Sequence, residues 1–237
     1  MSTEIKRPPL SAMMHHPVDE IRRLGLTVEA SHTAWLEQMQ PYAEVFASAH
    51  GPFMKGQMRL NPASTDECFR EESVKIIEDF IDMTTAFDKI RQVNLHFGCM
   101  RRADQEQATG QYGEYDIQVE SFQRIADFAD ERDKEIVLEN SKTYWEGVSD
   151  DTSYDTVDWS KQRVNFGTDP EEWIRMCEDV DKANVGLCLD TSHACTYSHK
   201  FPEDERRDVL FGFLQRPELI RHVHWSCLLY TSPSPRD

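Results

Sequence analysis

The sequence predicts an α/β fold, namely a (β/α)8 TIM barrel that is truncated at its C-terminal end and lacks its last βα unit. Short apolar runs of strand length alternate with segments of helical periodicity, which is typical of parallel strands joined by crossover helices. No G-x-G-x-x-G motif follows any run, which favours a barrel over a doubly wound dinucleotide-binding sheet. The expected strands cover residues 10–15, 26–31, 45–50, 92–97, 136–140, 185–190 and 221–225.

Four helices are expected between these strands, because apolar residues recur there near a 3.6-residue period. One of them begins with Asp169 as a candidate N-cap and Pro170 at the first helical position, and both residue types suit the start of a helix. The expected helices cover residues 66–90, 116–132, 170–183 and 203–215.

We expect one domain over residues 1–226 and a foreign tail over residues 227–237. The tail reads CLLYTSPSPRD and resembles the translation of a sequencing adapter. A complete barrel of this type has about 250 residues or more, so a native chain that stops near residue 226 would lack its last unit. We expect such a fragment to be poorly active and to expose an unpaired strand edge, which favours aggregation.

Charge and cysteine content narrow the range of functions. Asp and Glu number 43 against 26 Lys and Arg, and the formal net charge of −17 disfavours a nucleic-acid partner. The six cysteines form no C-x-x-C pair, which favours free thiols in a reducing compartment. The sequence shows neither the apolar region of a secretory signal nor an apolar run that could span a membrane. We therefore expect a cytoplasmic protein without a membrane partner.

Ionisable residues occupy the C-terminal ends of six expected strands. Side chains alternate across a strand, and the residues that share a face with these six are mostly small or polar. The opposite face carries apolar residues that suit packing against helices. Because barrel active sites form at the C-terminal ends of the strands, we expect the six side chains to converge. They are Glu29, His50, His96, Glu139, Asp190 and His224.

Three carboxylates and three imidazoles in a narrow mouth would be costly to bury unless they were paired. A divalent cation resolves this cost, because it neutralises the carboxylates and accepts lone pairs from neutral imidazoles. A single strand-end carboxylate often only caps the next helix, and we expect this structural role for Glu29. For His96, Glu139, Asp190 and His224 taken together, metal binding is the expectation.

Four segments carry these residues: VNLHFG at 93–98, IVLENS at 136–141, VGLCLDTSHA at 185–194 and IRHVHW at 220–225. With SAHGPF at 48–53, they resemble the xylose isomerase-like barrel superfamily. This superfamily comprises sugar and sugar-phosphate isomerases and epimerases, together with the type-IV apurinic/apyrimidinic endonucleases. The D-T-S-H-A element is the most specific part of the match, whereas L-E-N alone is weak.

The resemblance implies roles for individual residues. Glu139, Asp190 and His224 match the metal ligands that the superfamily shares. His193 matches the residue that binds substrate in the epimerases and a metal ion in the endonucleases. Two further elements of the family would fall beyond residue 226: the last strand with its additional Glu ligand, and the Asp-x-His element of the endonucleases.

The resemblance favours a metal-dependent sugar or sugar-phosphate isomerase or epimerase that acts through an enediolate. One divalent ion (Mn, Co, Zn or Mg) would polarise a ketose carbonyl, Glu139 would transfer a proton, and His193 would hydrogen-bond a substrate oxygen. Trp145 is a candidate for packing on the sugar, although packing of its loop against the core explains it equally well. The expected partner is a small carbohydrate, and a homo-oligomer is the expected assembly because family members are often oligomers.

The alternative is a zinc-dependent phosphodiesterase like the type-IV endonucleases, which would hold up to three zinc ions. His50 and His96 support this alternative, because they match the positions that bind the additional zinc ions in those enzymes. The net charge of −17 opposes it, because binding of a phosphate backbone draws on Lys and Arg. A barrel that binds metal without catalysis is a third alternative.

Overall fold

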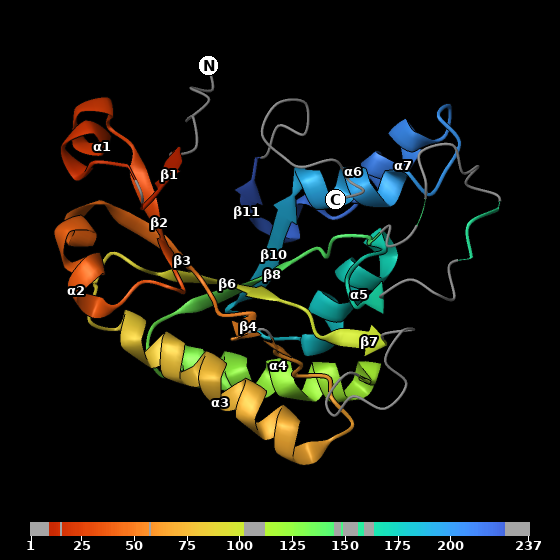
Figure 1. Ribbon diagram of the computed structural model, residues 1–237, viewed down its shortest axis with the longest axis horizontal. Coiled ribbons are helices and arrows are strands. Elements are labelled where there is room, and N and C mark those ends of the chain that lie inside the picture. Colours follow the sequence, from red (N-terminus) through yellow and green to blue (C-terminus); the bar gives the residue numbers. More distant parts are fainter. Residues whose placement is uncertain are drawn as a thin grey trace.

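The computed structural model describes residues 10–14, 16–56, 58–101, 112–144, 148, 156–158 and 164–225. Seven parallel strands form one sheet (Figure 1), and each predicted strand is present within one or two residues of its expected limits. In sheet order, the strands are β1 (Ser11–Met13), β2 (Thr27–Ser31), β3 (Phe46–His50), β6 (Gln92–His96), β8 (Glu135–Glu139), β10 (Val185–Asp190) and β11 (Ile220–His224).

The sheet curls until strands near its two ends meet across a lumen. In the sheet order, β3, β6, β8 and β10 separate β2 from β11, yet Glu29 Oε2 of β2 accepts a hydrogen bond from His222 Nε2 of β11 at 2.9 Å. Among the described residues, β1 pairs only with β2 and β11 pairs only with β10, so the barrel is open between β1 and β11. The structure therefore confirms the predicted α/β barrel, without a closing unit in its described part.

Three long helices cover the outer face of the sheet, as predicted: α3 (Glu67–Thr84), α4 (Tyr115–Asp130) and α5 (Pro170–Val180). Helix α4 contacts α3 on one side and α5 on the other (Figure 1). The start of α5 matches the prediction, because Asp169 Oδ1 accepts hydrogen bonds from the amides of Glu171 and Glu172. None of the helices in the described ranges combines the length and the hydropathy that crossing a bilayer requires.

Helix α3 is shorter than predicted, and the other helices are short and depart from the prediction. Helix α3 ends at Thr84 rather than at residue 90, and the hydroxyls of Thr84 and Thr85 donate to carbonyl oxygens of its last turn. The expected helix at 203–215 shrinks to α7 (Arg206–Gly212). Segments of three to eight residues show too few turns for a periodic pattern. The helices missed for this reason are α1 (Val18–Leu24), α2 (Leu36–Met39), α6 (Thr191–Ser198) and the 3-10 helices Gln40–Val45 and Pro217–Leu219.

Two short antiparallel pairs follow strand ends on the side where the predicted site lies. The hairpin of β4 (Met54–Lys55) and β5 (Met58–Arg59) comes directly after β3, and β7 (Cys99–Arg101), which follows β6, pairs with β9 (Val164–Asn165). These pairs are too short to show an alternating pattern in the sequence, and they add backbone around the mouth of the barrel.

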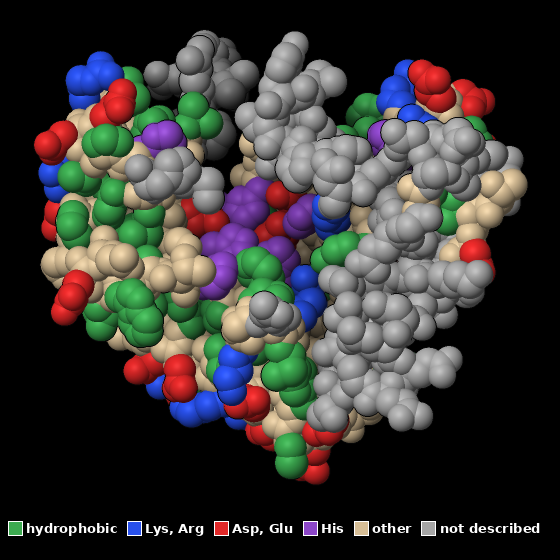
Figure 2. Space-filling view, in the orientation of Figure 1, with side chains coloured by type: hydrophobic (Ala, Val, Ile, Leu, Met, Phe, Trp, Pro, Cys, Tyr) green, Lys and Arg blue, Asp and Glu red, His purple; other side chains and the backbone are tan. Residues whose placement is uncertain are grey.

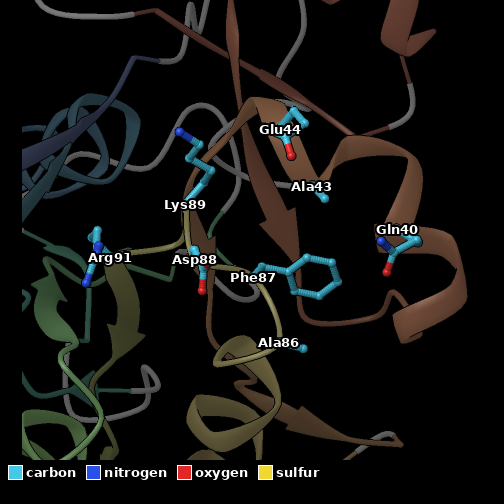
Figure 3. A pocket seen from close by; sticks show the side chains of 8 residues that line it. All are labelled: Gln40, Ala43, Glu44, Ala86, Phe87, Asp88, Lys89 and Arg91. Carbon is cyan, nitrogen blue, oxygen red and sulfur yellow. The ribbon is translucent and has the colours of Figure 1, made fainter.

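A hollow of about 600 Å³ lies at the other end of the barrel (Figure 3), where residues 40–44 precede β3 and residues 86–91 precede β6. Its lining mixes acidic and basic side chains, among them Glu44, Asp88, Lys89 and Arg91. The amino-terminal ends of barrel strands are associated with stability rather than with catalysis. We therefore place no active site in this hollow.

Trp173 of α5 provides a test of how the helical layer is attached to the sheet. Its side chain is fully buried, and its Nε1 donates a hydrogen bond to the carbonyl oxygen of Leu138 in β8 at 2.8 Å. We expect Trp173→Ala to lower the free energy of unfolding by about 3–5 kcal/mol in urea denaturation, because it removes this bond and leaves a cavity. Trp35→Ala is the control, since Trp35 is 77% exposed and its loss should change stability by about 0.5 kcal/mol or less. Similar losses in both variants would contradict the role of Trp173.

Candidate active site

The strand-end side chains predicted from the sequence meet at the carboxyl ends of the strands. Figure 2 shows His side chains gathered with acidic side chains in a hollow near the centre of this face. Four imidazoles have a ring nitrogen within 3.8 Å of a carboxylate oxygen of Glu139, and they belong to His50, His96, His193 and His224.

Glu139 ends β8 at the middle of this cluster, and its residue exposure is only 1%. Its Oε1 lies 3.2 Å from His193 Nδ1, and its Oε2 lies 3.3 Å from His224 Nδ1 and 3.4 Å from His96 Nε2. The side-chain amide of Asn94 also donates to Oε2. Burial alone would raise the pKa of Glu139, but the neighbouring imidazoles outweigh it and hold the pKa well below its usual range. The carboxyl group is therefore ionised at neutral pH.

Asp190 combines two roles that a strand-end aspartate can have. Its Oδ1 caps helix α6 and accepts hydrogen bonds from Ser192 N, Ser192 Oγ and His193 N at 2.7–2.9 Å. Its Oδ2 faces the cluster, 3.9 Å from His224 Nδ1. The cap fixes the orientation of the carboxylate, so one oxygen is held by the helix and the other points at the site.

Backbone carbonyls determine which ring nitrogen of two histidines carries the proton. His50 Nδ1 lies 3.0 Å from the carbonyl oxygen of Gly51, and His193 Nδ1 lies 2.8 Å from that of Asn140. A carbonyl oxygen only accepts, so both rings donate from Nδ1, and in the neutral rings Nε2 keeps its lone pair. His50 Nε2 lies 3.2 Å from His96 Nε2, so it faces the interior of the cluster.

Glu29 and His222 belong to the cluster, although we expected Glu29 only to cap the next helix and predicted no role for His222. Glu29 Oε2 accepts hydrogen bonds from His222 Nε2, from His224 Nε2 at 3.2 Å and from Ser48 Oγ at 3.0 Å. Burial opposes ionisation of Glu29, but the two imidazoles lower its pKa far below the usual value. Their positions in the strands could have identified both residues from the sequence, because their side chains lie on the same face of the sheet as the other strand-end groups.

The imidazoles differ in how the cluster shifts their pKa values. Burial lowers the pKa of His96 from 6.5 to about 3, because the charge of Glu139 only partly compensates for the loss of water. Burial also disfavours the charged form of His224, but hydrogen bonds to Cys188, Glu139 and Glu29 outweigh it and raise its pKa. The pKa of the buried Cys188 thiol rises to about 12, chiefly through desolvation. The cluster therefore favours the neutral form of His96 and the charged form of His224.

An aromatic side chain forms one wall of the cluster. The ring of Phe53 lies 4.9 Å from the ring of His96 and 5.7 Å from that of His50, measured between centroids. It also contacts His32, which follows β2. Trp145, the aromatic residue predicted to pack on a substrate, lies outside the described residues.

Groups of three donor atoms in the cluster lie close enough together to hold a divalent cation. Ligand atoms of Glu139, Asp190 and His193 lie within 4.8 Å of one another, as do those of His50, Glu139 and His224. The described ion-pair partners of Glu139 are imidazoles, without Lys or Arg, so a cation would supply the fixed positive charge that this carboxylate lacks. Mixed carboxylate and imidazole ligation suits Mn²⁺, Co²⁺ or Zn²⁺, and the residues present therefore fit such an ion.

The family model described as xylose isomerase-like TIM barrel matches residues 12–226, and the chain belongs to this family. No curated protein matches the sequence significantly. Among solved structures, a D-tagatose 3-epimerase-like protein has a TM-score of 0.63 at 18% identity, with 92% of this chain and 76% of that chain covered. The apo form of 3-keto-D-glucoside 4-epimerase from E. coli has a TM-score of 0.60 at 13% identity, with 91% and 77% covered.

A xylose isomerase-like TIM barrel protein from Mycobacterium smegmatis, solved in complex with magnesium, has a TM-score of 0.51 at 14% identity. The alignment covers 88% of this chain and 72% of that chain. At these identities the three structures share the fold with this protein.

The buried state of His96 leads to a pH dependence that can be measured in chelator-treated protein. Folded His96 has a pKa of about 3, while the unfolded chain takes up the proton near 6.5. Between these values the unfolded state binds more protons, so the free energy of unfolding falls as the pH falls, by about 1 kcal/mol per pH unit. We expect His96→Gln to flatten this slope between about pH 6.5 and pH 5 in urea denaturation.

The control for this experiment is His16→Gln, which removes an exposed imidazole outside the cluster. The pH range ends near pH 5, because Glu29 and Glu139 add their own acid sensitivity below the usual carboxyl pKa of 4.5. An unchanged slope in His96→Gln would show that His96 is not held neutral by burial.

Proposed function

We propose that this protein is a metal-dependent sugar epimerase or isomerase that moves a proton to and from the carbon next to a ketose carbonyl. The observation that carries the proposal is Glu139, a carboxylate with 1% exposure that faces imidazoles from four other elements of the barrel. Two solved structures of the same fold bear epimerase names, and a third contains magnesium, which supports the same conclusion.

Glu139, Asp190 and His224 are the residues that would hold the ion, with Asp190 contributing the oxygen that helix α6 leaves unused. The bound ion would act as a Lewis acid that polarises the carbonyl and the adjacent hydroxyl of the sugar. His50 and His96 lie beside the same carboxylate oxygen and could complete or support the ligand set.

The protein's own groups would carry out the proton transfer. Glu139 is ionised at neutral pH and can accept the proton of the acidified carbon, which leaves an enediolate. His193 is held by the carbonyl oxygen of Asn140, so its Nε2 can accept a hydrogen bond from a substrate hydroxyl and fix its orientation. If the proton is taken from C3, delivery of a proton to the opposite face of C3 by a second group gives the epimer. If it is taken from C1, its return to C2 gives the aldose.

Glu139→Gln tests the role of the carboxylate. We expect it to lower the rate of solvent hydrogen exchange into a ketohexose such as D-tagatose by about 10²–10⁴-fold, because the amide cannot accept the proton. The exchange reaction is run in deuterium oxide with added Mn²⁺ or Co²⁺. The ion is then removed, because it broadens the lines, and the exchange into the sugar is measured by NMR. Glu135→Gln is the matched control at the other end of β8, where Glu135 pairs with Arg221 at 3.6 Å, and it should leave the rate unchanged. Equal rates in the two variants would contradict the proposed base.

A phosphodiesterase of the endonuclease type is the second candidate function. The specific observation in its favour is that His50 Nε2 and His96 Nε2 lie 3.2 Å apart beside Glu139 Oε2, an arrangement that could hold a further zinc ion. The net charge of −17 opposes it, because binding of a phosphate backbone draws on Lys and Arg.

Metal analysis and a duplex with one abasic site separate the two functions. For an epimerase we expect about one divalent ion per chain and no cleavage of the duplex. Several tightly bound zinc ions, together with cleavage that His50→Ala abolishes, would favour the phosphodiesterase and overturn our choice.

A further inference from the structure

Arg59 is positioned at the mouth of the site by the hairpin that follows His50. It is the last residue of β5, and its Nη2 donates to the carbonyl oxygen of Phe97 at 3.3 Å, directly after His96 at the end of β6. Its Nη1 lies 3.5 Å from the hydroxyl oxygen of Tyr144, in the segment that follows β8. One guanidinium thus connects the segments after three neighbouring strands of the site.

The charge of Arg59 is not balanced by a carboxylate among the described residues. Its contacts there are a carbonyl oxygen, a phenol and the face of Phe53 at 6.0 Å, and its buried Nε has no hydrogen-bond partner. Several other arginines are paired with carboxylates, as Arg124 is with Glu71 and Glu78. Removal of a guanidinium from water costs free energy unless an anion compensates, so a bound anion would be stabilised here.

The positive charge of Arg59 can offset the negative charge of carboxylates that lie deeper in the site. Glu29, Glu139 and Asp190 would repel a substrate that carries its own negative charge, beyond what a single divalent ion neutralises. Arg59 extends from the rim, whereas Glu139 lies buried at a strand end, so the two groups would contact different parts of one sugar. A cation at the rim would offset this repulsion for an anionic group remote from the reacting carbon.

We propose that Arg59 forms an oxyanion subsite and that the substrate is a sugar bearing a phosphate or carboxylate group. The planar fork of a guanidinium can donate two parallel hydrogen bonds to either group. The proposal rests on the proposed function for the sugar itself, whereas the anion subsite stands on the geometry of Arg59. Such a subsite would distinguish the substrate specificity of this protein from that of an enzyme of the same fold that binds a neutral ketose.

Binding is measured by isothermal titration calorimetry on the full chain loaded with Co²⁺, with D-fructose, D-fructose 6-phosphate, D-fructuronate and inorganic phosphate as probes. We expect the wild type to bind an anionic sugar about ten- to a hundredfold more tightly than D-fructose, as charge-assisted hydrogen bonds imply. Arg59→Gln should abolish this preference and leave the affinity for D-fructose unchanged, and Arg59→Lys should retain part of it. The two anionic sugars show whether phosphate or carboxylate is preferred.

Arg70→Gln is the matched control, because Arg70 is also half-buried and donates to a carbonyl oxygen, that of Ser64, but belongs to α3. Circular dichroism of every variant establishes that it is folded. Equal affinity of the wild type for neutral and anionic sugars, or an unchanged preference in Arg59→Gln, would overturn the subsite. If no sugar binds but inorganic phosphate binds in a manner that Arg59→Gln abolishes, the subsite stands and the proposed epimerase function fails. Absence of both phosphate and sugar-anion binding refutes the subsite.

Discussion

A buried negative charge organises this molecule. Glu139 ends a strand in the interior of the sheet, and water reaches only 1% of the residue, so its ionised form depends on the groups that surround it. Those groups come from the ends of β3, β6 and β11 and from the start of α6. The curl of the sheet, the cap of α6 and the paths of the loops are thereby tied to one carboxylate. Replacement by an apolar residue would leave several imidazoles without the anion that holds them.

Asp190 shows how a structural and a chemical role can coexist in one side chain. The helix cap consumes only Oδ1, through the amides of Ser192 and His193 and the Ser192 hydroxyl, and it holds the plane of the carboxylate. The same turn places His193 next to Glu139, so the D-T-S-H segment positions two members of the cluster with one piece of backbone. The cap therefore does not exclude the proposed metal ligation by Asp190, because Oδ2 still faces the cluster.

The repeating part of the fold was predictable from the sequence, because seven strands and three long helices leave clear periodic patterns. The alternation of faces also predicted which six strand ends would meet. Helix α6 was missed, since its eight residues follow a strand directly and show little amphipathic pattern. The pairing of Glu29 with His222 and His224 was missed for another reason: it depends on how far the sheet curls, which no local pattern encodes. Arg59 likewise reaches the site through a hairpin too short to leave a signal.

The contact between Glu29 and His224 joins residues separated by 195 positions in the chain. Because the entropic cost of closing a loop rises with its length, we expect this contact to form late in folding, after the strands that lie between have paired. During synthesis, β2 emerges from the ribosome long before β11, so the amino-terminal half of the protein exists for a time with Glu29 and without its imidazole partners. A nascent chain can therefore pair most of its strands before His224, one of the proposed metal ligands, has been synthesised.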